Sequence, residues 1–212
     1  MNPPPLITFA VHAEVAPARR QLHQCQIPCR LLVTSIGARA THGAVLRTLD
    51  DSLPPFVISC GFAGGLDPAL PRGRLVYEAD PAFPLVNRMP ACDAARVAFL
   101  ASDRILTSAT EKTAARDQSH ADAVEMESFA IRQLCRERGI PSATFRVISD
   151  TAGEDLPLDF TRFLTSSGRF RYEQLALAVL RSPARIPPLI RFQRQTREVA
   201  NILASGLCTL FQ

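Results

Sequence analysis

Two segments of the sequence, AVEMESFA at residues 123–130 and FRVISD at residues 145–150, decide the fold. Both are mostly apolar, and both carry acids: Glu125 and Glu127 where a helical run opens, and Asp150 where a β-branched strand ends. An ionised carboxylate is costly in apolar surroundings unless a partner pairs with it. Acids kept at the ends of buried elements are therefore candidates for a functional site.

Strand-like and helix-like segments alternate along the rest of the chain. Short apolar runs predict strands at residues 6–11, 31–35, 56–60, 72–78, 97–100, 104–107, 121–126 and 142–148. Helix signals predict one helix that begins near Pro17, one through Leu46 and Leu49, and two at residues 109–119 and 127–137. Residues 79–96 have little pattern and are expected to form a loop. Such alternation is typical of an α/β sheet with ligands at the carboxyl edge of its strands.

Length and composition bound the class of protein. The 212 residues, of which 47% are apolar, suit a single domain that spans residues 1–212. The formal charge of +4 is too small to indicate nucleic-acid binding, and no nucleic-acid motif accompanies it. The sequence has neither a signal peptide nor the roughly 20 consecutive apolar residues of a membrane span. We therefore expect a cytoplasmic protein.

The six cysteines are scattered, and several lie in apolar runs. Cys25 and Cys29 with His23 resemble half of a zinc site, but no second half follows at ligand spacing, so no metal is predicted. Buried, reduced cysteines indicate a reducing compartment.

The C-terminal part is rich in arginine, and its apolar residues predict a basic helical tail over about residues 170–205. Two interpretations stay open. The helix either packs on the sheet with a solvated arginine face, or it contacts an anionic membrane surface as a peripheral element.

Glycines follow two of the predicted strands. Gly37, with Arg39 and Thr41 close behind it, would let an anion approach backbone N–H groups, although a solvated arginine explains Arg39 equally well. Three glycines at residues 61–65 allow close backbone approach after the third strand. This pattern is neither a dinucleotide fingerprint nor a P-loop.

Three acids fall near strand ends and can therefore converge: Glu14, Glu127 and Asp150. Glu14 alone could equally be a charge that favours a helix N-terminus. Acids without a metal and without an ordered Ser/His/Asp set suit proton transfer and stabilisation of a cationic transition state. Cleavage at a sugar anomeric carbon is the obvious example.

Four segments, in this order, resemble the purine nucleoside phosphorylase and methylthioadenosine/S-adenosylhomocysteine nucleosidase superfamily. They are AVHAEV at 10–15, CGFAGGL at 60–66, VEMES at 124–128 and RVISD at 146–150. The resemblance implies a three-layer sandwich with a central mixed β-sheet flanked by helices. It also implies an enzyme that cleaves the N-glycosyl bond of a purine nucleoside, without a cofactor and as a homo-oligomer, a dimer or a trimer.

The same resemblance implies individual roles. Asp150 would protonate or hydrogen-bond purine N7, and Glu14 would orient the attacking water. Glu127 would accept hydrogen bonds from the ribose 2′ and 3′ hydroxyls, Met126 would pack against the sugar, and Arg146 would pair with one of the acids. The remaining substrate contacts that it implies are Gly61, Ala63, Gly64, Ser149 and, for the purine, Ile105 and Leu106.

The nucleophile is open between water and phosphate. A phosphate would use the backbone at residues 61–65 with Arg39 and Thr41, and would give ribose 1-phosphate. Glu14 favours water, because a carboxylate repels a bound phosphate. A non-catalytic relative that only binds nucleosides is the second alternative.

The 5′ side of the substrate departs from the family pattern. Residues 79–100 are shorter than the family's insertion, which predicts an open 5′ side and an unusual 5′ substituent. The segment RSPARIPPLIRF at residues 181–192 resembles the tail of the hopanoid-associated nucleoside phosphorylase-like subgroup. That resemblance implies an adenosine linked through its 5′ carbon to a lipid.

Overall fold

The computed structural model describes residues 3–165, 168, 170–171, 173–175 and 186–212. Its strands are β1 Leu6–Phe9, β2 Arg30–Val33, β3 Val57–Gly65, β4 Leu75–Ala79, β5 Ala95–Arg96, β6 Phe99–Ala101, β7 Ala123–Glu125 and β8 Ser142–Asp150. Its α-helices are α1 His12–Gln24, α2 Ala38–Asp51, α3 Ala109–Ser119, α4 Ser128–Glu137 and α6 Ile186–Phe211. Three short 3-10 helices are η1 Val86–Arg88, η2 Pro90–Cys92 and η3 Phe160–Phe163.

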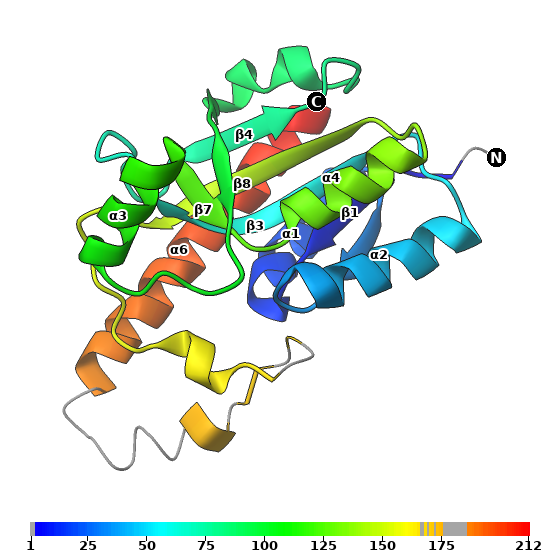
Figure 1. The fold of residues 1–212 in the computed structure, drawn as a ribbon. Coiled ribbons are helices and arrows are strands. Elements are labelled where there is room, and N and C mark those ends of the chain that lie inside the picture. The colour runs from blue at the N-terminus through cyan, green and yellow to red at the C-terminus, as the bar shows by residue number, and fades with distance from the viewer. Residues whose placement is uncertain (1–2, 166–167, 169, 172, 176–185) are drawn as a thin grey trace.

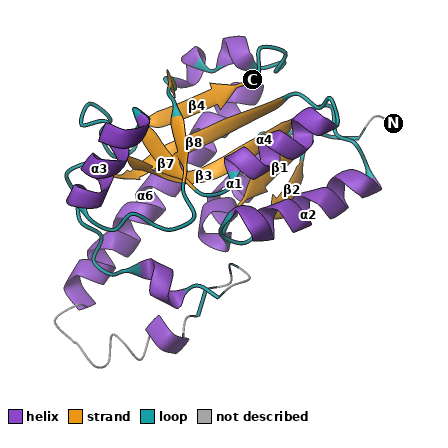
Figure 2. Ribbon diagram, viewed as in Figure 1, coloured by secondary structure: helices purple, strands orange, loops and turns teal. Residues whose placement is uncertain are grey.

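All eight strands form one mixed sheet (Figure 2). Its main path runs β2-β1-β3-β8-β4-β5, and β7 joins β3 to β6. The strands β2, β1, β3 and β8 are parallel, whereas β4 is antiparallel to β8 and β7 is antiparallel to β3. Because β1, β3 and β8 are parallel, the segments that follow them start at one edge of the sheet.

Helices cover both faces of the sheet and make it a three-layer sandwich. In Figure 1, α6 passes behind the sheet, and α2 and α4 lie in front of it. Neighbouring residues of β1 point to opposite faces: Ile7 packs in the cluster that contains α1 and α6, and Leu6 packs in the cluster that contains α2 and α4. The fold is therefore the α/β sandwich with a flanked, mixed central sheet that the sequence predicted.

The last helix, α6, has two different halves. Its C-terminal half is buried on the sheet through Leu203 and Leu207, and Gly206 lies so close to β4 that a Cβ there would be 2.5 Å from Leu75 Cδ1. Its N-terminal half carries arginines and the exposed Ile190. Of the predicted tail, residues 172 and 176–185 lie outside the described residues. The packed-helix interpretation holds for the C-terminal half.

Three local expectations were wrong. Helix α1 begins at His12, not near Pro17, because the Glu14 carboxylate accepts the backbone N–H groups of Ala10 and Val11. Residues 104–107 are a loop and not a strand, since Thr107 N–H bonds to Glu111 Oε2 in the cap of α3. Residues 79–96 contain η1, η2 and β5, where a plain loop was expected.

Among the described helices, none combines the length and the apolarity that a membrane crossing requires. The described part of the chain also holds no group of three or more His, Cys, Asp or Glu side chains arranged to bind a metal ion.

Candidate functional site

The β3 strand is the centre of the candidate site, because charged side chains approach the part of this strand that extends beyond its pairing with β1. Gly61 is the tightest point: a Cβ there would lie 2.4 Å from Arg146 Nη1 and 2.7 Å from Glu14 Oε1. Further along the strand, a Cβ on Gly64 would lie 3.4 Å from Asp150 Oδ2. The glycines therefore let side chains from α1 and β8 reach the backbone of β3.

Glu14, in the first turn of α1, is held by the backbone on both carboxylate oxygens. Oε2 accepts the N–H groups of Ala10 (3.0 Å) and Val11 (3.1 Å), and Oε1 accepts the N–H of Phe62 on β3 (2.9 Å). The residue is only 3% exposed. Burial raises the pKa of Glu14 above its ordinary value, while Arg146 and the backbone N–H groups oppose that rise.

Arg146, from the middle of β8, is the cation of this buried cluster. Its Nη2 lies 2.6 Å from Glu125 Oε2 and 3.3 Å from Glu127 Oε2, and it also donates to Ser59 Oγ at 3.2 Å. Removing a lone guanidinium from water is costly, so these partners are what allow it to be buried. The cluster ties β8 to the segment between β7 and α4.

Glu125 and Glu127 have different surroundings although both contact Arg146. Glu125 Oε2 also accepts the N–H groups of Glu127 (2.8 Å) and Ser128 (2.6 Å), so it caps the start of α4. Glu127 is the N-cap residue itself, and its Oε1 accepts the N–H of Gly37 at 2.9 Å. Burial raises the pKa of Glu127 to about 7, against the opposing effect of Arg146. This carboxyl group is therefore only partly ionised at neutral pH.

Asp150, the last residue of β8, has a donor on each carboxylate oxygen. Ser149 Oγ donates to Oδ1 at 2.6 Å, and Lys112 Nζ lies 2.6 Å from Oδ2. Ser149 lies within hydrogen-bonding distance of Ala63 O as well, at 3.3 Å. Lys112 belongs to α3, so this ion pair fastens α3 to the end of the central strand.

Lys112 is the residue of this region that the sequence analysis missed. It is the single lysine of an arginine-rich chain. The sequence did contain a signal for Lys112. In a chain that otherwise uses arginine for its cations, a single lysine on a polar helix indicates a position where arginine cannot replace it. Its partner, 38 positions further along the chain, could not be found from spacing.

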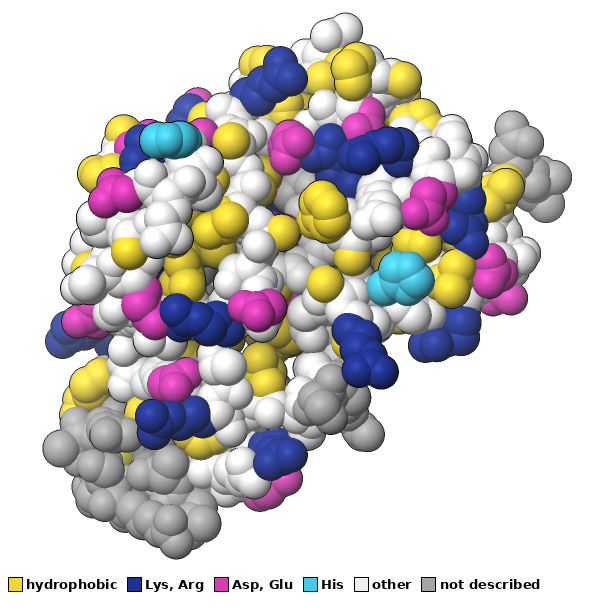
Figure 3. Space-filling model, in the orientation of Figure 1, with side chains coloured by type: hydrophobic (Ala, Val, Ile, Leu, Met, Phe, Trp, Pro, Cys, Tyr) yellow, Lys and Arg dark blue, Asp and Glu magenta, His cyan; other side chains and the backbone are white. Residues whose placement is uncertain are grey.

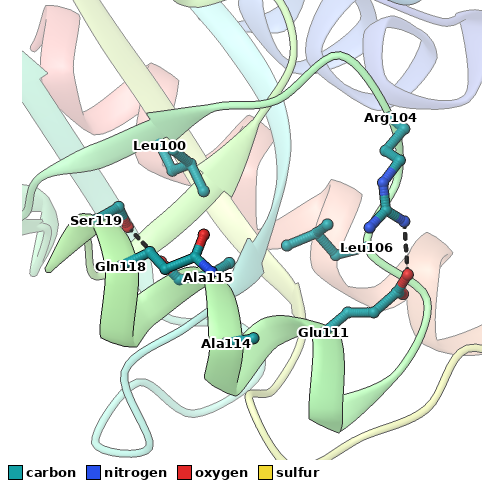
Figure 4. A pocket seen from close by; sticks show the side chains of 8 residues that line it. All are labelled: Leu100, Arg104, Leu106, Glu111, Ala114, Ala115, Gln118 and Ser119. Atoms are coloured by element: carbon teal, nitrogen blue, oxygen red, sulfur yellow. Dashed lines mark hydrogen bonds and ion pairs between the residues drawn. The ribbon is translucent and has the colours of Figure 1, made fainter.

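The remaining expected substrate contacts lie around these acids. Met126, between β7 and α4, is half-buried beside Glu127. Leu106 is buried with Leu66 and Val124, and Ile105 is half-buried in the same loop before α3. Leu106 also lines a pocket of about 390 Å³ between this loop and α3 (Figure 4). None of the three acids lines that pocket.

The two residues expected to bind phosphate lie in the first turn of α2. Thr41 is buried, and its hydroxyl lies 3.0 Å from Thr34 Oγ1 and 3.2 Å from Ser35 O. Arg39 is exposed. The face shown in Figure 3 mixes basic and acidic side chains and presents no continuous basic patch.

Comparison with protein families and curated sequences finds relatives of one kind. The model of the phosphorylase superfamily matches residues 85–181. The 5′-methylthioadenosine/S-adenosylhomocysteine nucleosidase of Geobacillus thermodenitrificans is 31% identical over 185 residues, which cover 71% of this chain and 78% of the relative. The enzyme of the same name from Geobacillus kaustophilus is 29% identical and covers 82% of this chain and 95% of the relative.

Solved structures share the fold over the whole chain. The nucleosidase of Neisseria meningitidis, in complex with methylthio-immucillin-A, superposes with a TM-score of 0.70 at 17% identity and covers 98% of both chains. The futalosine hydrolase of Helicobacter pylori superposes with a TM-score of 0.69 at 15% identity and covers 98% of this chain and 97% of that one. The solved structures share the fold, and the sequence relatives show that the chain belongs to the phosphorylase superfamily and is similar to its 5′-methylthioadenosine/S-adenosylhomocysteine nucleosidases.

Proposed function

We propose that this protein cleaves the N-glycosidic bond of a purine nucleoside, with adenine as the base and a modified 5′ group on the ribose, by attack of water at the anomeric carbon. The observation that carries the proposal is the buried carboxylate of Glu14, fixed by three backbone N–H groups beside Gly61 and Arg146. A carboxylate whose pKa is raised by burial is suited to take a proton from water.

The ribose would be held by Glu127. Its Oε1 is already oriented by Gly37 N–H and its Oε2 by Arg146, so the carboxylate is fixed before a ligand arrives. Vicinal hydroxyls are donors that a carboxylate can accept as a pair. Met126, next to it in the chain, would pack against the sugar ring.

The base would leave with the help of Asp150. Breakage of the bond to the anomeric carbon leaves negative charge on the purine, and a proton or hydrogen bond at N7 lowers the barrier. Asp150 lies at the carboxyl end of β8, beside Gly64, with Ser149 directing one of its oxygens. Ile105 and Leu106 would contact the purine.

Water is favoured over phosphate by two features. Glu14 and Glu127 place negative charge where a phosphate would bind. In addition, the Thr41 hydroxyl already makes hydrogen bonds within the protein, and Arg39 is exposed. The test is adenine release with and without inorganic phosphate, together with an assay for ribose 1-phosphate. Release without phosphate supports hydrolysis, strict phosphate dependence makes the protein a phosphorylase, and binding without base release makes it a non-catalytic relative.

An apolar 5′ group is supported by the segment that follows β8. Ile36 N–H, directly before Gly37, donates to Gly168 O at 3.1 Å, so this segment reaches the loop that orients Glu127. It carries Phe160, whose ring stacks on Phe192 of α6 at 5.1 Å. Cleavage rates for adenosines with hydroxyl, methylthio and longer alkylthio groups at the 5′ carbon test the idea; a preference for the hydroxyl group would contradict it.

A lipid as the 5′ substituent is the second candidate, as the hopanoid-associated resemblance implies. The observation in its favour is the exposed Ile190, 61% accessible, among Arg191 and Arg194 in the first half of α6. Co-sedimentation with anionic vesicles tests it, with Ile190→Glu as the variant that should abolish binding. Deleting the whole tail is not a usable test, because Leu203 and Leu207 belong to the core.

A further inference from the structure

The buried ammonium of Lys112 has three acceptors and no contact with solvent. Its Nζ lies 2.6 Å from Asp150 Oδ2 and donates to Thr151 O and Glu154 O, each at 2.8 Å. The side chain is 0% exposed. An ammonium has three N–H donors, so each has one partner. The loop after β8 thus wraps the amine and aims it at the catalytic-site carboxylate.

A structural role alone does not account for a lysine here. An apolar side chain would leave Asp150 Oδ2 and the carbonyls of Thr151 and Glu154 without this donor, so the position needs a cation, but not necessarily a lysine. The rest of the chain uses arginine for its cations. Arginine is always protonated, whereas a buried lysine can release its proton. A lysine at position 112 therefore fits a role in which the side chain releases a proton and later regains it.

The state of Asp150 makes such a donor necessary. Its Oδ1 accepts from Ser149 Oγ and its Oδ2 accepts from Lys112 Nζ, so the carboxylate is paired as an ionised acceptor. In this state it has no proton for the departing purine. Both donors lie 2.6 Å from the buried Asp150, but an ammonium is a much stronger acid than a serine hydroxyl, so the proton that can move to Asp150 is the one on the lysine.

We propose that Lys112 supplies the proton that Asp150 delivers to the leaving base; this rests on the proposed nucleosidase function. As the bond between C1′ and N9 breaks, its electron pair passes to the base. N7 takes a proton from the Asp150 carboxyl, which takes one from Lys112 Nζ. The base leaves neutral, the carboxylate is unchanged, and after release a solvent proton returns to the amine through Asp150. The attacking water gives its proton to Glu14, which returns it to the solvent.

The test compares two leaving groups in three variants. An adenine nucleoside needs a proton on its base, whereas a 4-nitrophenyl riboside with the same 5′ group does not. Lys112→Met removes the proton source and retains most of the volume, and Lys112→Arg retains the charge without a transferable proton. Arg116→Met is the matched control, because Arg116 is on the same helix but pairs with Asp67 and Asp122.

We expect Lys112→Met and Lys112→Arg to lower kcat on the adenine nucleoside by about 100- to 1000-fold, with KM changed by less than about 3-fold. The nitrophenyl riboside should lose less than about 5-fold, and Arg116→Met should leave both substrates near the wild-type rate. Activity of Lys112→Met on adenosine should also recover as the pH falls, because solvent then protonates Asp150 directly. Equal losses on both substrates, or no loss, would overturn the proposal.

Chemical rescue by an added amine gives a second test, which applies if one of the Lys112 variants fails to fold. In Lys112→Ala, added ethylamine should restore adenine release in proportion to its protonated concentration and leave the nitrophenyl rate unchanged. No rescue in a folded variant, judged by its circular dichroism, counts against the proposal. Wild-type protein that cleaves neither substrate would instead contradict the proposed function, so the two failures are distinguishable.

Discussion

At the scale of the residue, the site is a problem of burying charge. Four titratable groups, Glu14, Glu125, Glu127 and Arg146, lie within one cluster, which brings together three carboxyl groups and one guanidinium. Burial raises the pKa of Glu14 and of Glu127, and for Glu127 the neighbouring Glu125 and Glu14 add to the rise. The protein keeps these acids at a cost in stability, which is what a binding or catalytic role would require.

The raised pKa of Glu127 predicts how stability depends on pH. The folded protein holds a proton on Glu127 up to about pH 7, whereas the unfolded chain loses it near the ordinary value of 4.5. The folded state therefore binds more protons between these values, and stability falls as the pH rises through this window. Glu127→Gln should raise Tm at pH 8 by several degrees, with little change at pH 4.5, and should lower activity by at least about 100-fold.

Thermal unfolding at both pH values checks this prediction, with Glu137→Gln, at the other end of the same helix, as the control that should show neither effect. An equal change in Tm at the two pH values would show that the raised pKa of Glu127 is not its cause.

The Lys112–Asp150 pair predicts strong coupling. Asp150→Asn leaves a buried ammonium without its carboxylate, and Lys112→Met leaves the carboxylate without its cation, so each should destabilise by about 3 kcal/mol. The double variant should be less destabilised than the sum of the two, by about 1–3 kcal/mol. Urea unfolding of the four proteins measures this, and effects that add within about 0.5 kcal/mol would rule out a direct interaction.

At the scale of the element, β3 is specialised at its carboxyl end. The first residues of the strand, such as Val57 and Ile58, are buried apolar residues that pair in register with β1 and β8. Beyond them the strand consists of small residues apart from Phe62, and its register with β8 shifts between Ala63 and Gly64. One half of β3 holds the sheet together, and the other makes room for Glu14, Arg146 and Asp150.

Gly61→Ala should disrupt the site and the fold together. The added Cβ would meet Arg146 Nη1 and Glu14 Oε1 well inside contact distance, and φ at this position is +152°. We expect a loss of at least about 2 kcal/mol in the free energy of unfolding, and of most activity. Gly153→Ala is the matched control, since a Cβ there meets nothing within 4 Å. Chemical denaturation and adenine release measure both; wild-type stability in Gly61→Ala would contradict the close approach.

At the scale of the whole molecule, α6, the last helix, packs in one hydrophobic cluster with α1, the first helix. Its C-terminal half packs with α1 against the face of the sheet opposite α2 and α4 (Figure 1). Its N-terminal half extends past the sheet and meets the segment that follows β8 through Phe160 and Phe192. Core packing and the position of the segment that follows β8 thus depend on the same helix.

A chain that stops after residue 198 should therefore fail to unfold cooperatively. It would lose Leu203, Ala204 and Leu207, all fully buried, and expose the face of the sheet beneath them. Exchanging Arg191, Arg194 and Arg197 for Gln, the control, should shift Tm by no more than about 2 °C. Differential scanning calorimetry compares the two, and a cooperative transition in the truncated chain would show that α6 is dispensable to the core.

Much of the fold followed from local pattern. Alternating strand and helix signals predicted the α/β sheet, and the acids at the strand ends pointed to its carboxyl edge, because periodicity and burial cost are properties of short segments. The pattern failed where a distant contact decided the local structure. Residues 104–107 have strand-like composition, but the cap of α3 and the lack of a neighbouring strand make them a loop.

The sequence by itself determined which residues are costly to bury, and so drew attention to Glu14, Glu127 and Asp150. Only the tertiary structure decided how these charges are paired. Arg146 lies between Glu125 and Glu127, and Lys112 faces Asp150. The physical reason is that an ion pair depends on the distance between two atoms after folding, and here the partners come from different elements of the sheet and its helices. Spacing along the chain carries no record of that distance.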